Sequence, residues 1–125
     1  MFYHSMSGSS YANDDIHVYY RGERINSMRT MSFVDLGFGY GRDPFQVCFA
    51  GHIINGAHPD SFQVLDDGYA KDLFHVYYQG DKMHGLMAST FISLGNGYAK
   101  DSLNVYYYGR KAEGLSPIAF YTSLN

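Results

Sequence analysis

The sequence predicts an all-β protein made of four tandem 29-residue repeats, which form stacked β-hairpins or a β-solenoid-like array. Two observations lead to this prediction. Five residue types recur at a spacing of 29 residues in all four repeats without a gap, and a fixed period of this kind is the signature of a repeat architecture. Short runs rich in Tyr, Val and Phe alternate with Gly, Asp and Asn, as strands alternate with turns. No window of ten or more residues shows helical periodicity.

The repeats cover residues 11–39, 40–68, 69–97 and 98–125, and we expect residues 1–125 to form a single repeat domain. Residues 1–10 are expected to be a partial repeat, or the remnant of a leader or of an expression vector. They lack the basic and apolar regions of an intact signal peptide. The five invariant columns are Tyr11, Tyr40, Tyr69 and Tyr98; Asp14, Asp43, Asp72 and Asp101; Val18, Val47, Val76 and Val105; Gly22, Gly51, Gly80 and Gly109; and Phe33, Phe62, Phe91 and Phe120.

Within a repeat, the local pattern predicts two or three short strands and a turn-rich connector, most clearly in the third repeat. A strand is expected at residues 69–71, a turn at Asp72, a strand at 76–78 and a further turn at Gly80. The β-type run 91–97 closes the repeat. A helical turn is expected in the connectors that contain Pro59-Asp60-Ser61 and Ser116-Pro117.

A repeat of 29 residues is shorter than a propeller blade but suits stacked hairpins, which are stabilised by their neighbours. In a flat coil, identical Asp side chains would stack at about 4.8 Å and repel one another. Hairpins that are offset or rotated between repeats are therefore favoured. A small closed β-barrel, which would leave no exposed edge, is the alternative.

The Val-Tyr-Tyr strand predicts which side chains are buried, because successive side chains on a strand point to opposite faces. We expect the four valines and the aromatic residue two positions after each to form the core. These aromatic residues are Tyr20, Phe49, Tyr78 and Tyr107. The opposite face carries Tyr19, Cys48, Tyr77 and Tyr106, and we expect it to be a shallower layer or an exposed aromatic row.

The recurrent Asp has a structural explanation. Each repeat offers one such carboxylate, whereas a calcium loop needs several oxygen ligands close together. An Asp side chain can accept a hydrogen bond from the backbone N–H two residues later and so define a tight turn. We expect this turn to join the Tyr-Ala-Lys strand to the Val-Tyr-Tyr strand, and the recurrent Gly to adopt a positive φ in the next turn.

No pattern predicts catalytic, cofactor-binding or metal-binding residues, and Cys48 is expected to be a packed, inert thiol. The function expected is therefore a non-enzymatic module that binds another protein, because Tyr is a frequent interface anchor and repeats present rows of similar side chains. A cell-wall or carbohydrate-binding aromatic repeat is the first alternative, weakened by the absence of Trp. A structural segment of a longer repeat protein is the second. The candidate partner-binding residues are Tyr19, Tyr77, Tyr106 and Tyr108.

The repeat resembles that of the bacterial DKNYY repeat family, named for an Asp-Lys-Asn stretch followed closely by a Tyr pair. The likeness runs from Tyr11 to about Leu124. It is clearest where Tyr69-Ala70-Lys71-Asp72 is followed by His75-Val76-Tyr77-Tyr78. The second repeat departs from it, with Cys48-Phe49 in place of the Tyr pair. The resemblance implies a bacterial origin, no established catalytic residue, and a setting among envelope or secreted proteins or toxin–immunity systems. A toxin-neutralising immunity protein is therefore a special case of the expected function. The location would be the envelope or the exterior if a leader was removed, and the cytoplasm otherwise.

Overall fold

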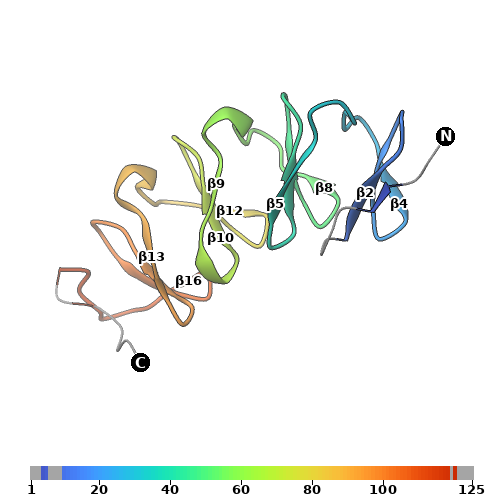
Figure 1. Cartoon of the computed structure of the whole chain (residues 1–125). Helices are drawn as coiled ribbons and strands as arrows, with labels where there is room; N and C mark the ends of the chain where they lie inside the picture. Colours follow the sequence, from blue (N-terminus) through green and yellow to red (C-terminus); the bar gives the residue numbers. More distant parts are fainter. Residues whose placement is uncertain (1–3, 6–9, 119, 121–125) are drawn as a thin grey trace. The chain divides into compact units, whose positions relative to one another are not determined.

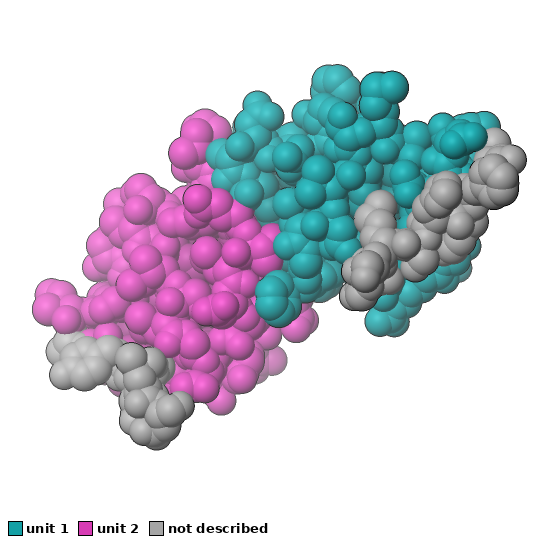
Figure 2. Space-filling model, viewed as in Figure 1, with its two compact units in different colours: residues 1–62 teal, residues 63–125 magenta. Residues whose placement is uncertain are grey.

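The structure is a computed structural model that describes residues 4–5, 10–118 and 120. The chain divides into two compact parts, shown in different colours in Figure 2. We call residues 1–62 the N-terminal half and residues 63–125 the C-terminal half. Each half contains two four-stranded antiparallel sheets, so each half corresponds to two repeats.

Every sheet is made of four consecutive strands in chain order (Figure 1). The first sheet contains β1 (His4–Ser5), β2 (Tyr11–Asn13), β3 (Val18–Tyr20) and β4 (Glu23–Ile25). The second contains β5 (Val34–Gly37), β6 (Tyr40–Arg42), β7 (Val47–Phe49) and β8 (His52–Ile53). The third contains β9 (Gln63–Val64), β10 (Tyr69–Lys71), β11 (Val76–Tyr78) and β12 (Asp81–Met83). The fourth contains β13 (Ile92–Gly95), β14 (Tyr98–Lys100), β15 (Val105–Tyr107) and β16 (Arg110–Lys111).

The all-β prediction is confirmed, and the helical content of the described residues consists of short 3-10 turns. These are η1 (Pro59–Ser61), η2 (Asp66–Gly68) and η3 (Ala88–Thr90). The closed-barrel alternative is wrong, because in the part of the chain that the structure describes each sheet is open and ends in two edge strands. No helix among those residues is long and apolar enough to cross a membrane.

The sheets are out of phase with the sequence repeats, and each has four strands where two or three were expected. Strand β13 lies in the repeat 69–97, yet it pairs with β14 of the following repeat. The turn between them, Asn96-Gly97, has positive φ at both residues, 55° and 84°. Two such residues form the type I′ turn that suits the twist of a two-residue hairpin. The Phe-containing run therefore opens the next sheet.

The predicted Gly turn is confirmed in all four repeats. In the third sheet, Gln79-Gly80 joins β11 to β12 with φ values of 46° and 82°. The glycines at the same position in the other sheets have φ values between 81° and 84°. This conformation costs glycine little because it has no Cβ.

The predicted Asp turn is also confirmed. Asp72 lies between β10 and β11, and its Oδ1 accepts hydrogen bonds from the backbone N–H groups of Phe74 at 2.9 Å and His75 at 2.8 Å. The other three aspartates make the same pair of bonds, at 2.7–2.9 Å. All four are buried. A buried carboxylate needs such donors, because burying an unsatisfied charge is costly.

Neighbouring sheets pack face to face within each half. In the C-terminal half, Tyr69 and Val76 of the third sheet share a core cluster with Ala99 and Tyr106 of the fourth. In the N-terminal half, Tyr11 and Val18 of the first sheet meet Cys48 of the second. The four predicted core valines are buried, with at most 1% exposed, which confirms that prediction.

Each repeat contains a triad of aromatic rings around its invariant Tyr. The ring centroid of Tyr69 lies 5.1 Å from that of Tyr78 and 5.5 Å from that of Phe91. Tilted contacts at these distances are favourable for aromatic pairs. The other triads are Tyr11, Tyr20 and Phe33; Tyr40, Phe49 and Phe62; and Tyr98, Tyr107 and Phe120.

The prediction that Tyr20, Phe49, Tyr78 and Tyr107 belong to the core needs correction. The first three are half-buried, and Tyr107 is 45% exposed. Within the C-terminal half, the following sheet accounts for the difference between Tyr78 and Tyr107. An added Cβ on Gly109 would lie 2.4 Å from the Tyr78 ring, so this ring packs directly against the backbone of the fourth sheet. The described residues place no further sheet over Tyr107.

Candidate functional site

In each half, a buried Tyr hydroxyl of the first sheet links it to the second sheet and positions two turns of the second one. The Tyr69 hydroxyl donates to the Gly97 carbonyl at 3.0 Å and accepts from the Gly109 N–H at 2.8 Å. In the N-terminal half, the Tyr11 hydroxyl donates to the Gly39 carbonyl at 2.6 Å and accepts from the Gly51 N–H at 3.4 Å. We call this arrangement the tyrosine bridge.

The tyrosine bridge requires a protonated hydroxyl. Burial raises the pKa of Tyr69 to about 12, and burial raises the pKa of Tyr11 as well. Both groups therefore remain neutral donors at physiological pH. The bridge keeps the turn that carries Tyr108 and Gly109 close to the third sheet.

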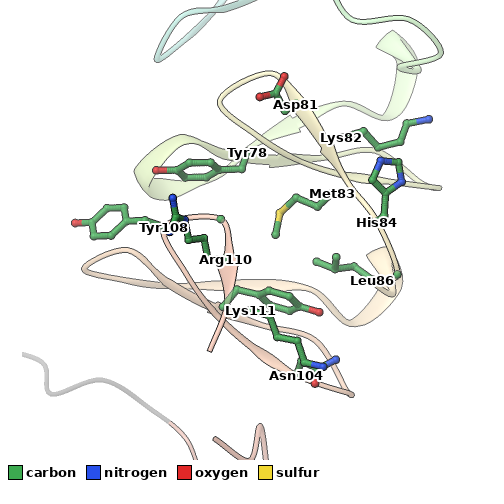
Figure 3. A pocket seen from close by; sticks show the side chains of 13 residues that line it. Tyr78, Asp81, Lys82, Met83, His84, Leu86, Asn104, Tyr108, Arg110 and Lys111 are labelled. Atoms are coloured by element: carbon green, nitrogen blue, oxygen red, sulfur yellow. The ribbon is translucent and has the colours of Figure 1, made fainter. Parts of the chain in front are cut away.

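A groove of about 660 Å³ lies between β12 and β16 in the C-terminal half, next to this turn. We call it the C-terminal groove. Figure 3 shows Tyr78, Tyr108 and Arg110 together at one end, and Lys82 and His84 at the other. Met83 and Leu86 lie between the two ends (Figure 3). The groove thus has an apolar floor with aromatic and charged ends.

The charge around the C-terminal groove is predominantly positive. Lys82, Arg110 and Lys111 line it, and Asp81 is the one carboxylate among its lining residues. Lys and Arg side chains are cationic at neutral pH, and Asp side chains are anionic. The groove therefore suits a ligand that carries negative charge.

The N-terminal half has a groove at the equivalent position, lined by different side chains. It has a volume of about 320 Å³ and lies between β4 and β8. Three of its lining residues, Ala50, His52 and Ile53, occupy the repeat positions of Tyr108, Arg110 and Lys111. The same fold thus provides two grooves, of which the C-terminal one has gained an aromatic ring and two cations.

A second candidate surface consists of an apolar residue at the tip of each Asp turn. The residue two positions after the Asp is apolar in every repeat and is between 54% and 67% exposed. Its backbone N–H donates to the Asp Oδ1, which holds the tip at the surface. We call these four residues the tip residues: Ile16, Phe45, Phe74 and Leu103.

The structure does not present the predicted aromatic row as a surface. Tyr77 is 0% exposed and Tyr106 is 4% exposed, so the expectation that they are accessible to a partner is wrong. Tyr19 is half-buried. Tyr108 is exposed and borders the C-terminal groove, so its role in binding stays a prediction.

Tyr77 and Tyr106 are buried because both faces of their sheets are covered. In the fourth sheet, Val105 and Tyr106 point to opposite faces and are both buried. Tyr106 packs on Phe91, with 6.2 Å between ring centroids. The row also has an internal role: Tyr19 donates to Asp14 Oδ2 at 2.7 Å, and Tyr77 donates to Asp72 Oδ2 at 2.9 Å.

The tip residues are not among the predicted partner-binding residues, although the sequence holds a signal for them. Turns are usually polar, yet this column of the repeat is apolar four times out of four. The residue just before each tip varies between Asp, Pro, Leu and Ser. An apolar column inside a turn indicates a set of apolar side chains at the surface.

Cys48 is buried, as predicted, and burial raises the pKa of its thiol to about 11. A thiol is a poor nucleophile when it is protonated. Among the described residues, no group of three or more His, Cys, Asp and Glu side chains is placed to hold a metal ion.

Comparison with known proteins identifies the family. The sequence profile of the DKNYY family matches residues 4–110, and the chain belongs to this family. No curated protein and no solved structure shows significant similarity to the chain.

Proposed function

We propose that this member of the DKNYY family is a non-enzymatic module that binds another protein. The observation that carries the proposal is the set of tip residues. Each of these side chains is more than half exposed at a turn tip, so most of its apolar surface faces water. Exposed apolar side chains that recur at one position of a repeat provide the apolar anchors that a protein interface buries.

We further propose that the four sheets form a stacked array of repeats. In each half, two sheets pack face to face, and a stack of similar sheets repeats its surface residues at regular intervals. A stacked array of repeats would therefore present similar apolar tips to one partner. Such multiple weak contacts add up when they engage the same partner.

A carbohydrate-binding role has less support. Sugars stack on flat, exposed aromatic faces, whereas Ile16 and Leu103 among the tip residues are aliphatic. The exposed rings of Tyr107 and Tyr108 meet at 73°, so they do not form one platform. A toxin-neutralising immunity protein is a special case of protein binding, supported by the family resemblance alone.

The test is capture of partners from lysate and envelope fractions of the source cell, with the full chain as bait. Ile16→Ser with Leu103→Ser changes one tip in each half. Met31→Ser with Ile118→Ser is the matched control, because both residues are at least 80% exposed but lie outside the tip positions. We expect one stoichiometric protein that the tip variant loses and the control variant keeps.

Equal loss from both variants would contradict the proposal, as would capture of no protein. Retention of the chain on lipid vesicles or on a glycan array in place of a protein would contradict it as well. A melting temperature common to all three baits shows that the tip variant is folded, because exposed substitutions usually change stability by about 0.5 kcal/mol or less.

A further inference from the structure

The cations of the C-terminal half form two groups: some hold the connectors of the fold, and the others line the C-terminal groove. This half contains five Lys and Arg residues. Lys71 donates to the carbonyls of Ala88 and Phe91 at 3.2 and 2.9 Å. Lys100 donates in the same way to Pro117 and Phe120 at 2.9 and 3.1 Å. These two lysines therefore hold the connectors in place.

The remaining three cations, Lys82, Arg110 and Lys111, all line the C-terminal groove. Within the part of the chain that the structure describes, no carboxylate forms an ion pair with them. The net charge of the chain is −3, so this positive patch is local and does not reflect a basic protein. Uncompensated charge of one sign in a groove attracts a ligand of the opposite sign.

Backbone groups border the same groove. Among the described residues, β12 pairs only with β11 and β16 pairs only with β15, so both are edge strands of their sheets. An edge strand leaves backbone N–H and C=O groups available to a further extended chain. Peptide recognition by strand addition uses such edges, while side-chain pockets select the sequence.

We infer that the C-terminal groove binds an extended, acidic segment of the partner protein. Carboxylates of the segment bind Arg110 and Lys111, and its apolar side chains pack on Tyr78, Tyr108 and Met83. Arg offers a planar fork of donors that matches a carboxylate. The inference deepens the proposed function and rests on it, because it names the chemistry of the partner.

The N-terminal half supplies a built-in comparison. Its equivalent groove has Ala50, His52 and Ile53 where the C-terminal groove has Tyr108, Arg110 and Lys111. The fold therefore accepts both sets of side chains at these positions. The triple variant Tyr108→Ala, Arg110→His, Lys111→Ile converts the C-terminal groove to the N-terminal composition and is expected to fold.

The probe is a fluorescent peptide of about eight residues in which Glu alternates with Val, titrated into the full chain and followed by anisotropy. The same peptide with Gln or with Lys in place of Glu tests the charge. The control variant Arg21→His, Arg24→Gln removes as much positive charge from the N-terminal half. We expect the Glu peptide alone to bind, with affinity that falls as salt is raised from roughly 50 to 300 mM.

We expect the triple variant to bind the Glu peptide roughly tenfold more weakly, the combined effect of three partly exposed interactions, and the control variant to bind it as the wild type does. Equal binding of the Gln or Lys peptide would overturn the inference, and so would equal weakening in both variants or no binding at all. Capture is measured separately with the tip variant, which leaves the residues of the groove unchanged. If the wild-type chain captures its partner but does not bind the Glu peptide, the groove alone is refuted. If the wild-type chain captures no protein, the proposed function is refuted.

Discussion

The tyrosine bridge allows a sharp test of how neighbouring sheets are held together. Tyr69→Phe removes one oxygen atom and leaves the aromatic triad with Tyr78 and Phe91 in place. The hydroxyl it removes is buried, donates to the Gly97 carbonyl and accepts from the Gly109 N–H. The substitution therefore probes two hydrogen bonds without opening a large cavity.

The substitution affects the hydrogen bonding of these two backbone groups unequally. The Gly97 carbonyl keeps a second donor, the N–H of Tyr108 at 2.8 Å. The partly buried Gly109 N–H loses its hydrogen bond to the hydroxyl, and leaving a donor unsatisfied costs about 1–3 kcal/mol when it is shielded from water. We therefore expect Tyr69→Phe to lower the free energy of unfolding by about 2 kcal/mol. For an m-value of about 2 kcal/mol/M, the urea midpoint falls by roughly 1 M.

Tyr98→Phe is the matched control. Tyr98 occupies the same repeat position in an equivalent triad, and its hydroxyl makes no hydrogen bond with the residues that the structure describes. Urea unfolding followed by far-UV circular dichroism should show a change of about 0.5 kcal/mol or less for this variant. The reasoning is refuted if Tyr69→Phe and Tyr98→Phe shift the midpoint equally.

Three further predictions concern the turns and the core. In urea unfolding, Gly109→Ala should destabilise the protein by about 1–3 kcal/mol more than Gly114→Ala. Both glycines have φ +81°, but only the Cβ at position 109 would overlap the Tyr78 ring. Equal losses of stability would contradict the ring contact. Hydrogen bonds from Tyr19 and from the N–H groups of His17 and Ile16 lower the pKa of Asp14 to about 2. The contribution of the Asp14 carboxylate to stability is therefore complete above about pH 4 and is lost as the pH falls towards 2. An acid titration followed by circular dichroism should show this loss in the wild type and not in Asp14→Asn. Cys48 should not react with a disulfide reagent at pH 8 until urea unfolds the chain, because burial raises its pKa to about 11; rapid labelling of the native protein would show that the thiol is accessible.

The sequence predicted the parts of the fold that are repeated and local. The Asp and Gly turns follow from residue chemistry at fixed positions, and both are present as expected. The phase of the sheets did not follow, because the Tyr column marks the second strand of each sheet and not the first. Strand β13 belongs to the next sheet through its Asn96-Gly97 turn, a signal that the repeat alignment obscured.

The burial of Tyr77 could not be predicted from alternation along a strand. Alternation separates core from surface only when one face of a sheet is exposed to water. Val76 and Tyr77 point to opposite faces, and both are fully buried. The pattern of one sheet carries no information about whether its second face is covered.

The C-terminal groove was hidden for a different reason. The repeat is defined by columns that agree, whereas Tyr108, Arg110 and Lys111 differ from their equivalents in the N-terminal half, Ala50, His52 and Ile53. Only the structure brings these residues together with Tyr78 of the preceding repeat.

The tyrosine bridge also bears on how such a chain can change in length. Its two bonds span 28 and 40 residues in both halves. The hydroxyl and the first turn that it contacts are encoded in one repeat, and the second turn is encoded in the next. A gene duplication of 29 codons therefore copies the tyrosine donor and its partner turns together. The new repeat can then form the same hydrogen bonds with the repeats on either side of it. Repeats can be gained or lost by recombination without a new interface having to evolve.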